Sequence, residues 1–295
     1  MLTVKQCVLC DGEIVKRKTG AVAPFLAKRI WNGKAPAVEL VECKKCSFLF
    51  FNPRLEPDEE QRLYAGYRQG GYQKDRFSCE PWYTEKFNAT LADPNSLGER
   101  REKLGAVLAT HLAGIDRPKI LDFGGDRGDL IQNLIPHAAA YIYEISGVEP
   151  AEGITCCADL ADCRAQSFDA IVCSNVLEHI GFPQTILDQL KTISAPHTKV
   201  FIEVPFESPF GPRLVLRRLA QFGVLAVTRP AVAWGLAKPG MLLIMHEHIN
   251  YFNQQSLEAM LGTWGAADTV SGSYELGGNM GKGFTMGWCA GRLGR

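Results

Sequence analysis

The chain contains 295 residues, 46% of them apolar, and its 32 basic and 32 acidic side chains give a formal net charge of zero. This length is enough for one substantial hydrophobic core and a small additional domain. The balanced charge argues against a nucleic-acid-binding protein, because binding to a phosphate backbone requires a basic surface. Arginines and a lysine interrupt the apolar stretch at residues 206–245, so it is too broken for a membrane-spanning helix of about 18 or more apolar residues.

Two cysteine pairs with the spacing Cys-x-x-Cys stand near the amino terminus. They are Cys7 with Cys10, and Cys43 with Cys46. Four thiolates form a closed, structural zinc site, and disulfides or unlinked thiols are the alternatives. The separation by residues 11–42 exceeds that of a simple zinc ribbon, so we expect a small subdomain or hairpin within a zinc-binding module of residues 1–55. No signal peptide precedes the cysteines, which with reduced thiols predicts a cytoplasmic protein.

Aromatic residues dominate the stretch that follows. Phe48 to Phe51 predicts a strand, and Pro57 with the acidic residues behind it predicts the start of a helix. Three tyrosines then gather around three glycines; they are Tyr64, Tyr67 and Tyr72. We interpret residues 56–98 as a tyrosine-rich linker with helical segments.

A glycine-rich turn follows an apolar strand predicted at Ile120 and Leu121. Asp122 ends this strand, and the glycines let the backbone turn sharply and lie close to a ligand. These glycines are Gly124, Gly125 and Gly128. The turn therefore predicts a site where main chain and ligand touch.

A helix and a second strand are predicted after the turn. Apolar side chains from Leu130 to Ile135 have helical spacing up to Pro136, and Tyr141 to Tyr143 forms the next apolar run. Glu144 ends that run, twenty residues after Gly124. A carboxylate at this place accepts hydrogen bonds from both ribose hydroxyls in dinucleotide folds, so the stretch predicts a nucleoside-binding site.

Strands and helices alternate through the rest of the chain. Residues 168–174 and 199–205 are typical of buried strands, and Pro183 opens a helix whose apolar residues share one face. A further helix and two strands are expected at 254–261, 269–274 and 284–289. We predict an α/β fold with a Rossmann-like, mainly parallel sheet of seven strands, closed by an antiparallel pair, whose ligands bind at the carboxyl ends of the strands.

Residues 206–245 are too long for an ordinary connection between two elements. The segment is rich in apolar side chains, and we expect a lid-like insertion that caps the substrate. A peripheral membrane or partner surface is the alternative, because exposed apolar patches often bind something.

Two histidines flank a carboxylate at His246, Glu247 and His248. Histidine accepts a proton near neutral pH, and a carboxylate can orient it or balance its charge. In an extended strand the two histidines share one face, whereas in a tight loop Glu247 and His248 converge. Zinc bound by all three is a competing interpretation.

The glycine turn and its neighbours resemble class I S-adenosylmethionine-dependent methyltransferases. Leu121 to Gly128 is similar to their motif I, Tyr143 to Ser146 to the acidic end of their second strand, and Phe168 to Ile180 to their fourth strand and its loop. The resemblance implies S-adenosylmethionine as cofactor and makes residues 99–295 the methyltransferase domain. One departure is Asp126, which replaces the usual middle glycine of the motif; a dehydrogenase fits less well.

The resemblance also implies which residues bind the cofactor. Asp122 and Gly124 would border its methionine part, Gly125 and Gly128 would bind the cofactor from the same turn, and Glu144 would bind the ribose. Asp159 would lie at the adenine, and Asn175 belongs to the loop after the fourth strand.

The order of cysteine pairs, aromatic strand, Asn-Pro and tyrosine-rich linker resembles a subset of these enzymes, the bacterial sugar methyltransferases of deoxysugar and surface-polysaccharide pathways. That resemblance implies a sugar or nucleotide sugar as acceptor, methylated at oxygen or carbon. It gives Glu247 and His248 an acid/base role, with His248 as the base, and makes His179 a lesser candidate. An RNA-modifying methyltransferase and a degenerate, cofactor-free scaffold remain as alternatives.

Overall fold

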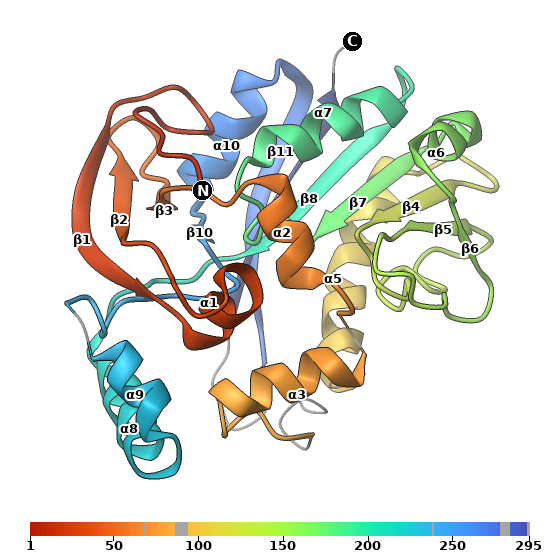
Figure 1. Cartoon of the computed structure of the whole chain (residues 1–295). Helices are drawn as coiled ribbons and strands as arrows, with labels where there is room; N and C mark the ends of the chain where they lie inside the picture. Colours follow the sequence, from red (N-terminus) through yellow and green to blue (C-terminus); the bar gives the residue numbers. More distant parts are fainter. Residues whose placement is uncertain (68, 86–93, 238, 278–283, 294–295) are drawn as a thin grey trace. The chain divides into compact units, whose positions relative to one another are not determined.

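The computed structural model describes the whole chain except residues 68, 86–93, 238, 278–283 and 294–295 (Figure 1). The chain divides into two compact units. It leaves the second unit twice, each time to add a segment to the first unit, and then returns. The first unit contains residues 1–91, 178–182 and 207–251; the second contains 92–177, 183–206 and 252–295. These units cut the chain differently from the predicted ranges 1–55, 56–98 and 99–295, because residues 178–182 and 207–251 join the amino-terminal part.

The second unit contains the seven-stranded sheet, with strand order β11-β12-β8-β7-β4-β5-β6. The five strands from β8 to β6 pair in parallel, and β12 pairs antiparallel with both β8 and β11. The predicted Rossmann-like sheet and its antiparallel closure are therefore confirmed. The strands are β4 (Lys119–Phe123), β5 (Ala139–Tyr143), β6 (Ile154–Cys156), β7 (Ala170–Ser174), β8 (Lys199–Pro205), β11 (Ala266–Leu276) and β12 (Phe284–Leu293).

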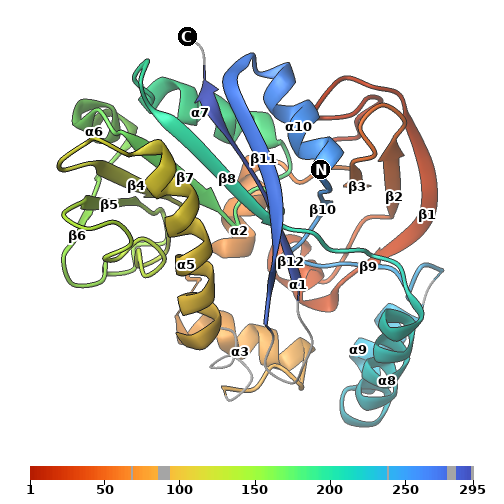
Figure 2. The ribbon, with the colours of Figure 1, turned by 180° about the vertical axis from the view of Figure 1, so that it is seen from behind.

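Helices of the second unit cover this sheet. On one face α5 lies across the strands, as Figure 2 shows, and its Leu104 and Leu108 are fully buried in one core cluster with Ile120 of β4 and Val172 of β7. Burial of these side chains removes apolar surface from water, which stabilises the layered arrangement. The helices are α5 (Pro94–His111), α6 (Leu160–Gln166), α7 (Pro183–Ile193) and α10 (Gln254–Thr263).

The helix predicted after the glycine turn is wrong. Residues between Asp126 and Pro136 form successive turns, with Gly128 at φ 80° and Asn133 at φ 53°. A positive φ interrupts the right-handed helical path, so the apolar spacing of Leu130 to Ile135 does not become a continuous helix. Leu130 and Ile131 are still buried in the core beside α5, which explains why the residues are apolar.

The first unit is built on a five-stranded sheet with strand order β10-β3-β2-β1-β9. Its two outer strands come from residues 244–251, so residues 1–55 do not complete the sheet alone. The elements are β1 (Ile14–Val22), α1 (Pro24–Trp31), β2 (Val38–Cys43), β3 (Leu49–Asn52), α2 (Pro57–Tyr64), α3 (Gly70–Cys79), α8 (Pro212–Thr228), α9 (Pro230–Leu236), β9 (Ile244–Met245) and β10 (Asn250–Tyr251).

Residues 206–245, predicted to be an insertion, contain the helices α8 and α9. The two helices lie side by side in both views (Figures 1 and 2). Among the described residues, no helix is long and apolar enough to cross a membrane.

The guanidinium of Arg54 is buried in the first unit and joins segments that are distant in sequence. It donates to the carbonyl oxygens of Phe51 at 2.8 Å and Gly181 at 2.7 Å, and to the side-chain oxygen of Asn250. Burial lowers its pKa to about 9, against the charge of Glu60. Arg54 therefore fixes residues 178–182 and strand β10 to the end of β3.

We predict that Arg54→Met lowers the free energy of unfolding by about 3 kcal/mol or more, because each buried acceptor left unpaired costs roughly 1–3 kcal/mol. Arg62→Met is the matched control. Arg62 is half exposed and forms a surface ion pair with Asp58, one turn earlier on α2, so its loss should cost under about 1 kcal/mol. Urea unfolding followed by circular dichroism measures both variants, and equal losses would contradict the role given to Arg54.

Candidate functional site

The carboxylate of Asp122 is buried at the carboxyl end of β4. Asp122 is 1% exposed, and neither of its carboxylate oxygens has a hydrogen-bond partner among the described residues. Burial raises its pKa to about 7, against the opposing charge of Arg100. Buried polar groups are nearly always paired, so this carboxylate indicates a missing donor or cationic group at the end of the strand.

The glycines after Asp122 lie where no side chain fits. A Cβ atom at Gly124, with φ 72°, would lie 2.8 Å from a methyl carbon of Val176, and one at Gly125 would lie 2.3 Å from Cγ of Asp122. The third glycine, Gly128, has φ 80° and would place a Cβ 2.8 Å from Ile142. Glycine is therefore required at each of the three positions.

Asp126, the departure from the usual motif, adopts φ 55°. Aspartate tolerates this left-handed conformation better than most residues, so the substitution preserves the turn. The backbone N–H of Asp126 donates to Glu144 at 3.1 Å, and that of Ser146 donates to the same carboxylate at 2.8 Å. Glu144 is thus aimed at the glycine turn, and an ionised carboxylate has further lone pairs for two hydroxyl donors.

Asp159 and Asn175 also lie at this edge of the sheet. Asp159 follows β6 and caps α6, where its side chain accepts from the N–H of Asp162 at 2.8 Å. Asn175 directly follows β7 with φ 55°, and its side chain is exposed. All seven predicted cofactor-binding residues therefore surround the carboxyl ends of neighbouring parallel strands.

Sequence reasoning missed a buried polar network beside Asp122. Arg100 of α5 donates to the hydroxyl of Ser174 and to the carboxylate of Glu203, both at 2.7 Å, and the Glu203 side chain is completely buried. Ser174 also donates to Glu203. The charged Glu203 within an apolar strand was a signal for this network, whereas nothing in the local sequence singled out Arg100.

The four amino-terminal cysteines converge in the first unit. All four are buried, and their sulfur atoms lie within 4.8 Å of one another. The separations of Cys10 from Cys43 and Cys46 are 3.6 and 3.4 Å, and Cys7 lies 3.8 Å from Cys46. These exceed the disulfide length of about 2.05 Å but approach the roughly 3.8 Å expected between sulfurs of a tetrahedral site with Zn–S bonds near 2.3 Å.

Backbone amides support the cysteine cluster. The N–H of Leu9 donates to Sγ of Cys7 at 3.4 Å, and the N–H of Lys45 donates to Sγ of Cys43 at 3.3 Å. Such bonds favour thiolates, which are the form that binds a metal.

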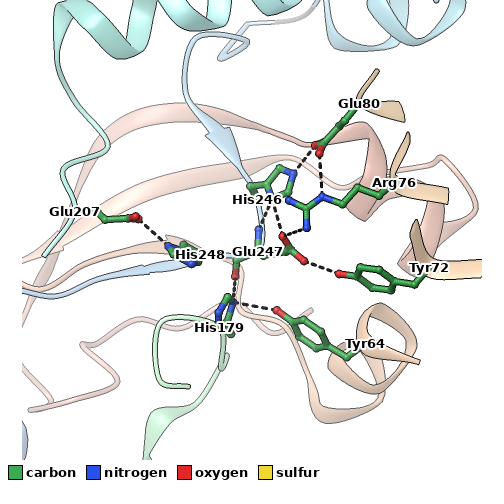
Figure 3. A network of polar contacts seen from close by, with 9 residues as sticks. All are labelled: Tyr64, Tyr72, Arg76, Glu80, His179, Glu207, His246, Glu247 and His248. Carbon is green, nitrogen blue, oxygen red and sulfur yellow. Dashed lines mark hydrogen bonds and ion pairs between the residues drawn. The ribbon is translucent and has the colours of Figure 1, made fainter. Parts of the chain in front are cut away.

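His246 and Glu247 belong to a dense ionic network in the first unit (Figure 3). His246 Nε2 bonds to the carboxylate of Glu80, and Arg76 donates to Glu80 at 3.1 Å and to Glu247 at 2.6 Å. Tyr72 donates to Glu247 as well. Although burial disfavours its charged form, the two carboxylates raise the pKa of His246 to about 9.

Glu247 is ionised within the same network. Burial alone would raise its pKa, but His246, Arg76 and Tyr72 outweigh burial and lower it well below the ordinary value. A cationic histidine and an anchored carboxylate are poorly suited to proton transfer at neutral pH. This pair therefore holds the segment in place.

His248 has different neighbours from His246. Its Nδ1 lies 2.7 Å from a carboxylate oxygen of Glu207, and its ring centroid lies 4.7 Å from that of His179 (Figure 3). Burial opposes the charge, but Glu207 outweighs it and raises the pKa of His248. The carboxylate bonded to His248 is therefore Glu207 rather than the predicted Glu247.

His179 completes this arrangement as a neutral ring. Its Nδ1 lies 3.0 Å from the backbone oxygen of Glu247 and 3.1 Å from the hydroxyl of Tyr64. Burial, followed by the charge of His248, lowers its pKa to about 4. Glu178, His179 and His248 offer ligand atoms within 4.8 Å of one another, whereas the predicted trio of 246, 247 and 248 forms no such group within the described chain.

The raised pKa of His246 predicts a pH-dependent stability. A histidine whose folded pKa of about 9 exceeds its ordinary 6.5 stabilises the fold fully below pH 6.5 and loses this contribution as the pH rises toward 9. The shift corresponds to roughly 3 kcal/mol. In urea unfolding, the wild-type protein should have a higher free energy of unfolding than His246→Gln below pH 6.5, and this difference should shrink as the pH rises toward 9. The exposed His197, changed to Gln, is the control, and a constant difference between wild type and His246→Gln would contradict the prediction.

Comparison with known proteins gives the family of the chain. A family model described as a methyltransferase domain matches residues 96–269, more than half of the chain. The chain belongs to this methyltransferase family, and it is an S-adenosylmethionine-dependent enzyme. No match is found among curated proteins.

Three of the solved structures that resemble the chain are methyltransferases at low identity and low TM-score. The CurJ carbon methyltransferase is 11% identical with a TM-score of 0.46, and the match covers 72% of this chain and 60% of that one. The 1,6-didemethyltoxoflavin N1-methyltransferase of Burkholderia thailandensis is 16% identical with a TM-score of 0.49, covering 88% and 96%. The N-methyltransferase NodS of Bradyrhizobium japonicum is 14% identical with a TM-score of 0.38, covering 68% and 98%. Likenesses of this size say nothing about the acceptor of this chain.

Proposed function

We propose that this enzyme methylates a small polar acceptor, a sugar or nucleotide sugar, with His248 as general base. The observation that carries the proposal is the His248–Glu207 pair beside the neutral His179. The side chain of His248 is 34% exposed, in contrast to the buried ionic network around His246. It is therefore the member of the histidine segment that an acceptor can reach.

The cofactor requires the features found at the carboxyl edge of the seven-stranded sheet. The carboxylate of Asp122, which has no hydrogen-bond partner in the described part of the chain, suits the cationic amino group, and Glu144 suits the two ribose hydroxyls. Asp159 would border the adenine, and Asn175 would line the same edge from the loop after β7. When bound, S-adenosylmethionine supplies an activated methyl group on a positively charged sulfur.

The remaining chemistry is removal of a proton from the acceptor. Nδ1 of His248 is hydrogen-bonded to Glu207, so Nε2 is the ring nitrogen that accepts the proton from the acceptor. The same carboxylate stabilises the imidazolium that forms, and Glu247 positions the segment through Arg76 and Tyr72. The proton comes from a hydroxyl in O-methylation, or from a carbon beside a ketone in C-methylation.

The tyrosines of the linker support a glycosyl acceptor. Tyr64 and Tyr67 stack edge to face at 5.9 Å, and Tyr67 and Tyr72 at 5.2 Å. Two of their hydroxyls are bonded to neighbours of His248, Tyr64 to His179 and Tyr72 to Glu247. This aromatic cluster beside the base, together with the resemblance to sugar methyltransferases, favours a sugar ring over a purely apolar acceptor.

The function is tested by measuring S-adenosylhomocysteine production with a panel of nucleotide sugars and with RNA. We expect turnover with a nucleotide sugar, and a loss of about 10²–10⁴-fold in kcat for His248→Ala with unchanged cofactor binding by calorimetry. Glu207→Gln should shift the rising limb of the pH–rate profile to lower pH, because Glu207 raises the pKa of His248. Methylation of RNA alone, or wild-type turnover by His248→Ala, would refute the proposal. Absent cofactor binding would favour a scaffold.

We also propose that the cysteine cluster holds one structural zinc ion. The four cysteines leave no open coordination position, so the ion would stabilise the first unit without taking part in catalysis. Cys43→Ser should lower the bound zinc measured by mass spectrometry and the midpoint of thermal unfolding. Cys156→Ser is the control, because that thiol is exposed and lies outside the cluster. Full zinc content in Cys43→Ser, or none in wild type, would rule out this site.

A further inference from the structure

The helices α8 and α9 expose an unusual amount of apolar surface. On α8, four side chains at helical spacing form an outward stripe. They are Leu216, Leu219, Val224 and Val227, with exposed fractions of 66%, 48%, 45% and 84%. The opposite face of the same helix packs inward through Phe222 and Leu225. Packing within the first unit therefore explains only one of the two apolar faces.

The second helix adds an exposed aromatic ring. Trp234 of α9 is 84% exposed, although tryptophan is usually well buried in a folded protein. Indole rings favour the boundary between lipid headgroups and acyl chains, because one side of the ring is apolar and its N–H is polar.

The charge of this helical pair is strongly biased. Residues 211–237 contain four arginines and no acidic side chain, in a chain whose net charge is zero. The arginines are Arg213, Arg217, Arg218 and Arg229. Arg213 and Arg217 are exposed and lie one helical turn apart, next to the stripe on α8. Long arginine side chains in this position reach past the apolar surface toward negative charge.

The pattern excludes two other occupants. Pairing with the same surface of a second copy would bring two arginine clusters together, which like-charge repulsion opposes. Insertion across a bilayer is excluded because no described helix is long and apolar enough. An apolar stripe bordered by arginines is instead typical of a helix that lies in the plane of a membrane surface.

We propose that the α8–α9 pair docks on the surface of an anionic lipid bilayer. Leu216, Val227 and Trp234 enter the boundary between headgroups and acyl chains, while the exposed Arg213 and Arg217 bind lipid phosphates. The enzyme would then work beside a membrane, and this docking is independent of which acceptor it methylates.

The test is co-sedimentation of the full-length protein with vesicles of phosphatidylcholine alone or with equal parts of phosphatidylglycerol. We expect binding to the anionic vesicles, little binding to the neutral ones, and weaker binding at high salt. Val227→Asp should reduce binding at least about tenfold, since it removes apolar contact and adds repulsion. Val270→Asp on β11 makes the same charge change at a 43% exposed site outside the helices and should bind like wild type.

Circular dichroism and thermal unfolding of each variant verify that both units are folded. Equal binding to neutral and anionic vesicles, equal loss in the two aspartate variants, or no vesicle binding by wild type would each overturn the proposal. The last outcome would favour an acidic protein partner or a lid over the acceptor.

Discussion

The buried guanidinium of Arg54 is the interaction on which the first unit depends. It binds carbonyl groups at the end of β3 and in residues 178–182, and it also binds Asn250 of β10. Glu60 accepts from the N–H of Gly181, where a Cβ atom would lie 2.0 Å from a backbone oxygen. These contacts hold three separate parts of the chain together, including the short segment that carries His179. The position of the candidate base therefore depends on a residue with no chemical role of its own.

The three histidines around the candidate base, His179, His246 and His248, differ in protonation because their surroundings differ. His246 and Glu247 are held in their charged forms by Glu80, Arg76 and each other, so they fix the backbone. His179 is kept neutral by burial, whereas His248 is tuned by Glu207 and stays partly exposed. Three histidines close together thus have three different protonation properties. The differences come from burial and from the carboxylates that face the rings, and not from the spacing of the histidines in the chain.

The two units supply different parts of the chemistry. In the second unit, the glycine turn and Glu144 create a polar edge, and the carboxylate of Asp122, unpaired among the residues that the structure describes, suits a cationic ligand. Arg100 and Glu203 lie behind it as an internal ion pair. The first unit contributes the cysteine cluster, the tyrosines and the histidine segment. The chain enters the first unit twice from the sheet of the second unit. Residues 178–182 follow β7 and its loop, and residues 207–251 follow β8.

The sequence by itself determined the features that depend on local spacing: the two cysteine pairs, the glycine turn, and the alternation of strands and helices behind the seven-stranded sheet. Each has a signature of a few neighbouring residues, because tight turns and buried strands restrict residue type locally. Only the tertiary structure decided the partners of these residues. Glu207 binds His248 across 41 positions, and Tyr72 binds Glu247 across 175. Contacts between distant segments leave no periodic trace, and neither did the positive φ of Asn133, which turned a helical apolar pattern into a series of turns.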